Sequence, residues 1–345
     1  MGAFSPWTRL AGVTDKDADR AGNVAKKYGL KRFASLEDML ECADVDVILN
    51  TTPPAFHYGV ALVALKAGKH VYNEKPICLD PKEADGLLEL AVSKGLRIGC
   101  APDTFLGAGI QTCVKLVDDG WIGRPVAATA FMAGRGPENW HPYPEFFYKP
   151  GGGPMYDMGP YYLSALVSLM GPVVRVSGSA GRGLATRTIT SEPLRGRVMD
   201  VEVPTHIAGT LDFESGAVGT LVTSFGVCAH NLPFMEIYGT EGTLSVPDPN
   251  TFGGPVSVRR LGEDEWHKMP LVSGFTENSR GLGLAEMVSS IEEGRAHLAS
   301  GVLARHALEA MRGIYEASES GAYHTMKSRC EKPGRLPAGM AVAAG

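Results

Sequence analysis

Lys75 is the residue whose setting in the sequence most suggests chemistry. It lies in GKHVYNEKP (residues 68–76), where a strand-like run ends in a glutamate and a lysine, and a proline follows. A lysine that is partly desolvated and close to another cation has a lowered pKa, which makes it a usable acid or base. The tripeptide Glu-Lys-Pro occurs again at residues 331–333, in a Pro- and Gly-rich segment. Only the surroundings of each copy can show which lysine belongs to a site.

Polar residues also end other strand-like runs of the first hundred residues. Asp15 ends TRLAGVTD, the loop NTTPP ends VDVILNTTPP (residues 45–54), and Asp103 ends LRIGCAPD. Ligands of open parallel sheets bind beyond the carboxyl ends of the strands. We therefore expect these groups to converge in one crevice with Lys75. This location would distinguish Lys75 from Lys332. The alternative for Lys75 is a solvated surface lysine.

Asp15 has the position of an acid that binds a dinucleotide. A carboxylate at the end of the second strand of such a fold accepts hydrogen bonds from the adenosine ribose hydroxyls. Its charge would repel the 2′-phosphate of NADP, so NAD is the predicted cofactor and NADP is less favoured. The alternative, that Asp15 caps the following helix, is compatible with this role.

The elements that must position these residues follow two patterns. Residues 1–102 alternate between strands and helices, which indicates a doubly wound parallel α/β sheet. Residues 103–330 contain alternating runs separated by expected hairpin turns, such as FESGAV and GTEGTL, and end in a long helical region. They predict an α+β domain with a large, mostly antiparallel sheet. Residues 331–345 are expected to form a loose tail.

The glycine fingerprint of dinucleotide-binding folds is missing, because no G-x-G-x-x-G occurs in the chain. We therefore expect a first strand, a phosphate-binding turn and a first helix, roughly 25–30 residues, to precede Met1. In the usual strand order the absent strand lies between TRLAGVTD and VDVILNTT. These two strands would then face each other across a gap.

Composition excludes several classes of protein. The length of 345 residues suggests two domains, and the net charge of -5 argues against a nucleic-acid partner. Six scattered cysteines fit free thiols in a reducing cytoplasm. No apolar run reaches the roughly 20 residues of a membrane span. The nine histidines lack ligand spacing, so no metal site is expected.

Four segments together resemble the Gfo/Idh/MocA family of NAD(P)-dependent sugar and polyol dehydrogenases. They are GVTDKDADRA, VDVILNTTPPAFHYGVALVALKAGKHVYNEKP, GGGPMYDMGPYYL and FESGAVGTL. The resemblance covers residues 8 to 325. It implies a Rossmann domain followed by an α/β domain whose large sheet often mediates oligomers, so we expect a homo-oligomer that acts on a small sugar or polyol.

The resemblance also implies roles for residues of the first domain. Lys75 would lie beside the nicotinamide and the substrate hydroxyl, with a cis bond to Pro76, and Glu74 would contact the cofactor near the nicotinamide. The residues that match the cofactor-lining loop of the family are Thr51, Thr52, Pro53 and His57.

In the second domain the family motif is an aspartate followed four residues later by a histidine. Asp157 matches the aspartate, whereas Tyr161 holds the histidine position. One helical turn puts both on one face, and a tyrosine can donate and accept a proton. Either Lys75 or Tyr161 is therefore the base, with Asp157 binding a sugar hydroxyl. For the neighbouring Tyr162 we favour aromatic packing.

The loop GRGPENWHPYPEFFY is expected to cover the substrate. Trp140 offers a face to a sugar ring, and His141 or Arg135 offers polar contacts; structural packing or surface exposure is the alternative for each. His206, in VEVPTHIAG, is a further candidate, although a lone strand histidine is more often structural.

Three functions remain open. The first is hydride transfer between NAD and a secondary hydroxyl of a sugar, cyclitol or related polyol. The second is an enzyme that retains NAD and uses transient oxidation for elimination or glycoside cleavage. The third is a non-catalytic, truncated homologue, which the missing fingerprint favours and the presence of Lys75, Asp157 and Asp15 opposes.

Overall fold

The computed structural model describes residues 6–272 and 274–342, which divide into two units. Unit 1 runs to Ala101 and also contains Gly281–Gly301, whereas unit 2 contains Pro102–Arg280 and the chain from Val302 onward. The sequence-based boundary assigns residues 281–301 to the second domain. In the structure this segment returns to unit 1 because its backbone pairs with a strand edge there: the Cys100 N–H donates to the carbonyl of Ala299 at 3.0 Å.

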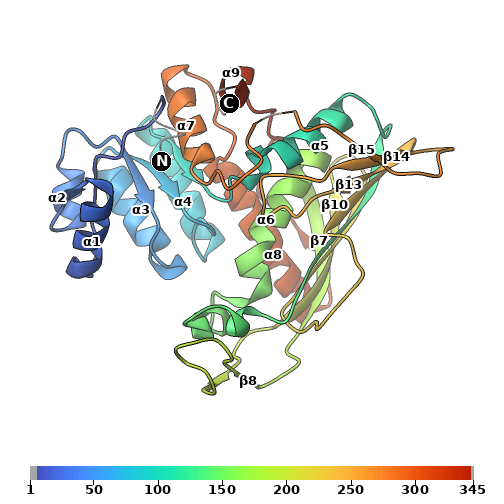
Figure 1. Cartoon of the computed structure of the whole chain (residues 1–345), viewed down its shortest axis with the longest axis horizontal. Coiled ribbons are helices and arrows are strands. Elements are labelled where there is room, and N and C mark those ends of the chain that lie inside the picture. Colours follow the sequence, from blue (N-terminus) through green and yellow to red (C-terminus); the bar gives the residue numbers. More distant parts are fainter. Residues whose placement is uncertain (1–5, 273, 343–345) are drawn as a thin grey trace. The chain divides into compact units, whose positions relative to one another are not determined.

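Unit 1 alternates strands and helices (Figure 1). Its elements are β1 (Gly12–Val13), α1 (Ala18–Tyr28), β2 (Lys31–Arg32), α2 (Leu36–Leu40), β3 (Val47–Asn50), the 3-10 helix η2 (Pro54–Phe56), α3 (His57–Lys66), β4 (His70–Asn73), α4 (Pro81–Ser93), β5 (Ile98–Cys100) and α7 (Leu282–Glu292).

The helix ends of unit 1 follow local sequence signals. The carboxylate of Asp17 accepts from the N–H groups of Asp19 and Arg20, and so caps α1. The helix ends at Gly29, whose φ of 65° is a left-handed conformation that glycine adopts without a Cβ penalty. Asp80 caps α4 in the same way as Asp17 caps α1, and Pro81 starts it.

The strands of unit 1 form two separate parallel sheets. β1 pairs with β2, and β3, β4 and β5 pair in that order. Within the described residues, β1 and β3 do not pair with each other.

Unit 2 is built on a sheet of nine strands in the order β15-β14-β13-β12-β6-β11-β10-β7-β16. Its strands are β6 (Pro125–Ala133), β7 (Val173–Gly181), β10 (His206–Phe213), β11 (Val218–Ser224), β12 (Met235–Gly239), β13 (Gly242–Val246), β14 (Ser257–Arg260), β15 (His267–Lys268) and β16 (His324–Thr325). Neighbouring strands are antiparallel except β6 and β11, so the sheet is mixed but mostly antiparallel, as predicted.

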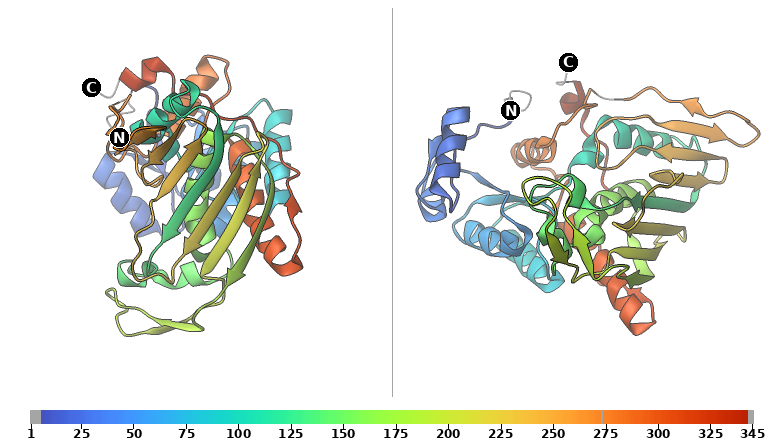
Figure 2. Two further views of the ribbon diagram at one scale, coloured as in Figure 1. Left: turned by 90° about the vertical axis from the view of Figure 1, so that its right-hand side faces the viewer. Right: turned by 60° about the horizontal axis from the view of Figure 1, so that its bottom comes forward.

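Helices cover one face of this sheet, and Figure 2 shows the other face toward the viewer in its left panel. The remaining elements of unit 2 are η3 (Thr104–Leu106), α5 (Ala108–Asp118), η4 (Pro137–Asn139), η5 (Pro144–Tyr148), α6 (Gly153–Met170), β8 (Thr186–Thr188), β9 (Val198–Asp200), α8 (Gly301–Ser320) and α9 (Ala338–Val342). α6 packs on β6, β10 and β11 and is buried along most of its length, which places the core between this helix and the sheet.

The segment after residue 330 is held to unit 2 where it is described, in contrast to the loose tail expected from its composition. Lys332 Nζ lies 2.7 Å from a carboxylate oxygen of Asp118, and the N–H of Leu336 donates to the side chain of Gln111 at 2.7 Å. Leu336 is buried, so an apolar contact adds to these polar ones.

Candidate active site

The carboxyl ends of β3, β4 and β5 meet at one edge of their sheet. Asn50 lies opposite Asn73, and Asn73 lies opposite Cys100. The residues that follow are therefore neighbours: the loop from Thr51, the turn from Glu74 and the segment from Ala101. The structure thus brings together three of the four strand ends that the sequence analysis placed in one crevice.

A cavity of about 680 Å³ opens between β1 and β3. Its walls come from the segment from Trp7 to Lys16, from residues 45–52, and from Leu284 and Val288 of α7. Three predicted cofactor-binding residues line it: Asp15, Thr51 and Thr52. The volume lies within the range of small-molecule and cofactor sites, roughly 300–1,000 Å³.

Asp15 is one of the residues that line this cavity. One carboxylate oxygen accepts from the N–H of Asp17 at 2.9 Å, and the other lies 3.4 Å from the guanidinium of Arg20. The cap of α1 is Asp17 and not Asp15. The capping alternative for Asp15 is therefore wrong, and its carboxylate retains lone pairs for a hydroxyl group.

The turn that contains Lys75 is fixed by its backbone. The N–H of Glu74 donates to the carbonyl of Asn50 at 2.9 Å, and the N–H of Lys75 donates to the Glu74 carboxylate at 3.2 Å. The bond between Lys75 and Pro76 is cis, as the resemblance implies. Both Glu74 and Lys75 are half-buried.

Two cysteines near this turn are unsuited to nucleophilic chemistry. Burial raises the pKa of the Cys78 thiol to about 12 and raises that of Cys100 well above its ordinary value. Both thiols are therefore protonated at neutral pH.

His57 differs from the direct cofactor contact expected from the sequence. It is fully buried, and its ring nitrogens lie 2.6 Å from the carbonyl oxygen of Pro76 and 2.7 Å from that of Thr52. Both nitrogens are engaged with the main chain. Pro53 and Thr51, in contrast, are exposed in the loop before it.

Sequence analysis missed two asparagines, Asn50 and Asn73. Both are buried, and the amide of Asn50 donates to the side-chain oxygen of Asn73 at 2.9 Å. A signal was present, because each asparagine is the last residue of an apolar strand at the edge where ligands bind. A buried amide at such a position needs hydrogen-bond partners.

Asp157 and Tyr161 lie on α6 in unit 2, one turn apart, as predicted. Asp157 is half-buried and Tyr161 is buried. The packing role favoured for Tyr162 fits its contacts, since it is 1% exposed and its hydroxyl donates to the carbonyl of Phe131 at 3.2 Å. Burial raises the pKa of Tyr162, so this hydroxyl keeps its proton.

The loop predicted to cover the substrate carries an aromatic cluster. Trp140 is 65% exposed and packs edge-on against His141 and Phe147 at ring-centroid distances of 5.4 and 6.3 Å. Arg135 is exposed. His206 is also exposed, at the start of β10, and its Nδ1 lies 2.9 Å from the hydroxyl of Ser224.

A half-buried ion pair anchors this loop to the rest of unit 2. The Glu138 carboxylate contacts the Arg187 guanidinium and the Tyr148 hydroxyl, and Arg187 also donates to the carbonyl of Phe225 at 2.7 Å. Burial, with the hydrogen bond to Glu138, raises the pKa of Tyr148. These contacts hold the loop in place close to its exposed tryptophan.

The residues present fit a dinucleotide only in part. Asp15 suits a ribose, and the loop from Thr51 and the turn at Lys75 suit the nicotinamide end. A diphosphate needs N–H groups at a helix N-terminus. In α1, α2 and α4 some of these groups donate to the side chains of Asp17, Ser35 and Asp80, whereas, within the described residues, α3 and α7 have no side-chain cap at their N-termini.

Among the described residues, no three His, Cys, Asp or Glu side chains are grouped so that they could hold a metal ion. No helix within residues 6–272 and 274–342 combines the length and apolar character needed to cross a membrane.

Two family models match the chain. Residues 3–101 match an oxidoreductase family with an NAD-binding Rossmann fold, and residues 110–245 match the GFO/IDH/MocA C-terminal domain. The two matches correspond to the two patterns read from the sequence.

Curated relatives match at low to moderate identity. The UDP-N-acetylglucosamine 3-dehydrogenase of Acidithiobacillus ferrooxidans is 42% identical over 93 residues, 27% of this chain and 29% of that protein. The chain thus spans less than a third of that relative's length. The dTDP-3,4-didehydro-2,6-dideoxy-alpha-D-glucose 3-reductase of Streptomyces violaceoruber is 27% identical over 321 residues, 86% of this chain and 90% of that protein.

Solved structures share the fold over nearly the whole chain. The apo form of levoglucosan dehydrogenase has a TM-score of 0.81 at 16% identity and covers 95% of this chain and 94% of its own. An NAD binding oxidoreductase from Klebsiella pneumoniae has a TM-score of 0.79 at 23% identity and covers 94% and 92%. At these identities the likeness concerns the fold.

Proposed function

Because this chain belongs to the Gfo/Idh/MocA family of oxidoreductases, we propose that it transfers a hydride between NAD and a secondary hydroxyl of a sugar, cyclitol or related polyol. One observation carries the proposal. The half-buried Lys75 stands at the carboxyl end of β4, beside the loop that follows β3. Ligands of parallel sheets bind at this edge.

Lys75 takes the hydroxyl proton when the alcohol is oxidised and returns it in the reverse direction. Asp157 accepts hydrogen bonds from sugar hydroxyls, and Tyr161 either relays the proton or is itself the base. NAD, when bound, supplies the hydride acceptor.

Asp15, Thr51, Thr52, Pro53 and Glu74 hold the cofactor. Asp15 lines the cavity and its carboxylate suits a free ribose 2′-hydroxyl, so the cofactor is NAD rather than NADP. Calorimetry that found equal affinity for NAD and NADP would contradict this preference.

The substrate is a sugar or polyol covered by the loop around Trp140. The exposed indole provides a flat apolar face, and Arg135, His141 and His206 provide polar contacts. The names of the two curated relatives described above both contain a nucleotide-linked sugar. Nucleotide sugars therefore belong in any substrate panel.

We also propose a homo-oligomer formed through the open face of the nine-stranded sheet. That face carries half-exposed residues, among them Thr129 and Tyr238, whose hydroxyls lie 3.0 Å apart. Light scattering coupled to gel filtration tests this assembly. A cytoplasmic location is supported by the six free cysteines, since oxidising compartments favour disulfides.

The test is NADH formation by the purified chain with excess NAD and a panel of sugars, cyclitols and nucleotide sugars. Oxidation of one panel member, with the ketone identified by mass spectrometry, supports the proposal. An elimination or cleavage product without net NADH would instead identify an enzyme that retains its cofactor. Sugar binding without NAD binding would establish a non-catalytic homologue.

A further inference from the structure

We propose that His57 is a positioning residue that clamps the Lys75 turn to the Thr52 loop by donating a hydrogen bond from each ring nitrogen. The clamp is a property of the fold. Only its effect on turnover rests on the proposed function.

The two partners of the ring decide its protonation. Nδ1 lies 2.6 Å from the carbonyl oxygen of Pro76, and Nε2 lies 2.7 Å from that of Thr52. A carbonyl oxygen can only accept, and a neutral imidazole carries one N–H and one lone pair. A neutral ring would therefore aim a lone pair at an oxygen across one of these short contacts. Both bonds form only when both nitrogens carry a proton.

Another buried histidine shows the opposite arrangement. Nε2 of His306 accepts from the N–H of Val173 at 3.0 Å, and its Nδ1 lies 2.8 Å from the hydroxyl of Ser328. This ring needs no second proton, and burial lowers its pKa to about 4. His306 is thus a neutral reference against which the ring of His57 can be measured.

The clamp is one part of a buried network around the Lys75 turn. The amide of Asn73 donates to the carbonyl of Ile77 at 3.0 Å, and the side-chain oxygen of Asn50 accepts from the Thr52 hydroxyl at 2.7 Å. Asn50 also donates to Asn73, which links the two strand ends. Asn50, His57 and Asn73 are all at most 2% exposed.

These bonds hold the main chain on both sides of Lys75. Before it, the Glu74 N–H is tied to β3 through the carbonyl of Asn50. After it, the carbonyls of Pro76 and Ile77 are tied to His57 and Asn73. A backbone that is held on both sides of Lys75 fixes the position from which the side chain starts. Proton transfer requires such positioning, because a misplacement of about 1 Å can cost about 10²-fold in rate.

The first test needs no substrate. Long-range proton–nitrogen NMR of the histidine-labelled chain near neutral pH reports which ring nitrogens are protonated. We expect the His57 ring to show two protonated nitrogens and the His306 ring to show one. A His57 ring with a single N–H would overturn the double-donor clamp.

The second test compares His57→Gln with His306→Gln, both at buried sites. We expect H57Q to change the rate at which a mild acylating reagent modifies Lys75, while Lys332 in the second Glu-Lys-Pro keeps its rate. H306Q should leave both rates unchanged although it lowers the melting temperature. Unchanged Lys75 labelling in a folded H57Q chain would overturn the positioning role.

Turnover separates this inference from the proposed function. With an active substrate, H57Q should lower kcat by about 10- to 100-fold with little change in the KM for NAD, and H306Q should not. If no substrate is turned over, the proposed function fails while NMR and labelling still decide the clamp. If substrate is turned over and H57Q keeps its kcat, the positioning role fails alone.

Discussion

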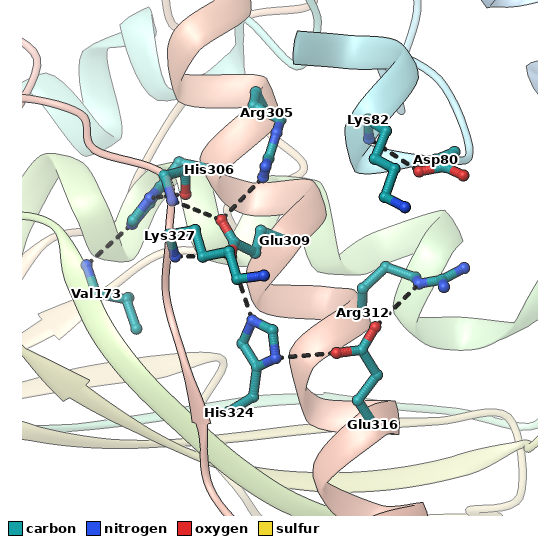
Figure 3. A network of polar contacts seen from close by, with 11 residues as sticks. Asp80, Lys82, Val173, Arg305, His306, Glu309, Arg312, Glu316, His324 and Lys327 are labelled. Atoms are coloured by element: carbon teal, nitrogen blue, oxygen red, sulfur yellow. Dashed lines mark hydrogen bonds and ion pairs between the residues drawn. The ribbon is translucent and has the colours of Figure 1, made fainter.

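The Glu309 carboxylate of α8 lies 3.2 Å from Nε2 of His324 in β16, and it also binds the chain that follows the strand (Figure 3). Its oxygens accept from the N–H groups of Lys327 and Ser328, each at 2.8 Å, and from Arg305 at 2.9 Å. A single buried carboxylate thus joins the last strand of the sheet to the helix that covers it.

This carboxylate predicts an acid-sensitive fold. Burial opposes its ionisation, but the hydrogen bonds from Ser328, Lys327 and His324 outweigh burial and lower the pKa of Glu309 to about 2. A carboxyl whose pKa is lower in the folded state stabilises the fold above its unfolded pKa, and this stability is lost as the pH falls from about 4.5 to 2. The pKa of His306 is lowered to about 4, so this residue adds a further loss of stability that begins as the pH falls below about 6.5.

Glu309→Gln should therefore lower the free energy of unfolding at pH 7 by about 1–3 kcal/mol, because an amide has one acceptor oxygen in place of two. The variant should also show a flatter loss of stability between pH 4.5 and 2. Urea unfolding across this pH range measures both. Glu319→Gln, at an exposed position of the same helix, is the control, and an equal loss there would contradict the assignment.

The repeated tripeptide offers a matched pair of lysine variants. Lys75→Met should lower kcat by about 10²–10⁴-fold, the usual contribution of acid–base catalysis, with a much smaller effect on NAD affinity. Lys332→Met removes only a surface contact to Asp118 and should leave kcat unchanged. Single-turnover reduction of NAD measures the chemical step. A K75M enzyme with its full rate would remove Lys75 from the mechanism.

The two neighbouring tyrosines of α6 form a second pair. If Tyr161 is the base, Tyr161→Phe should cost as much as K75M, and if it relays or orients, the loss should be smaller. Tyr162→Phe loses one buried hydrogen bond to Phe131 and should cost about 1 kcal/mol of stability without lowering kcat. Comparing kcat with melting temperature for both variants decides between these roles. A larger drop of kcat in Y162F than in Y161F would assign the catalytic role to Tyr162 and the packing role to Tyr161.

Asp15 should set the cofactor preference. Asp15→Ser removes the charge that would face a 2′-phosphate, so the ratio of kcat/KM for NADP to that for NAD should rise about tenfold. Asp17→Ser keeps a capping side chain on α1 and should leave the ratio unchanged. Equal kcat/KM for both cofactors in the unmodified enzyme would refute the role given to Asp15.

The sequence by itself determined the local elements and the fold class. Asp17 and Gly29 mark the two ends of α1, and Pro81 begins α4, because helix caps and helix breakers act on residues close to them in the chain. The order of strands and helices identified the parallel sheet, and strand-end chemistry pointed to Asp15 and Lys75.

Only the tertiary structure decided where distant segments go. The return of residues 281–301 to unit 1, the anchoring of Leu336 on Gln111 and the parallel pairing of β6 with β11 in the nine-stranded sheet depend on partners far apart in the chain. The role of His57 was decided in the same way. Its type and position suggested contact with a cofactor, but its surroundings bury it between two carbonyl oxygens. A histidine's partners come from several strand ends at once, and spacing along one segment does not specify them.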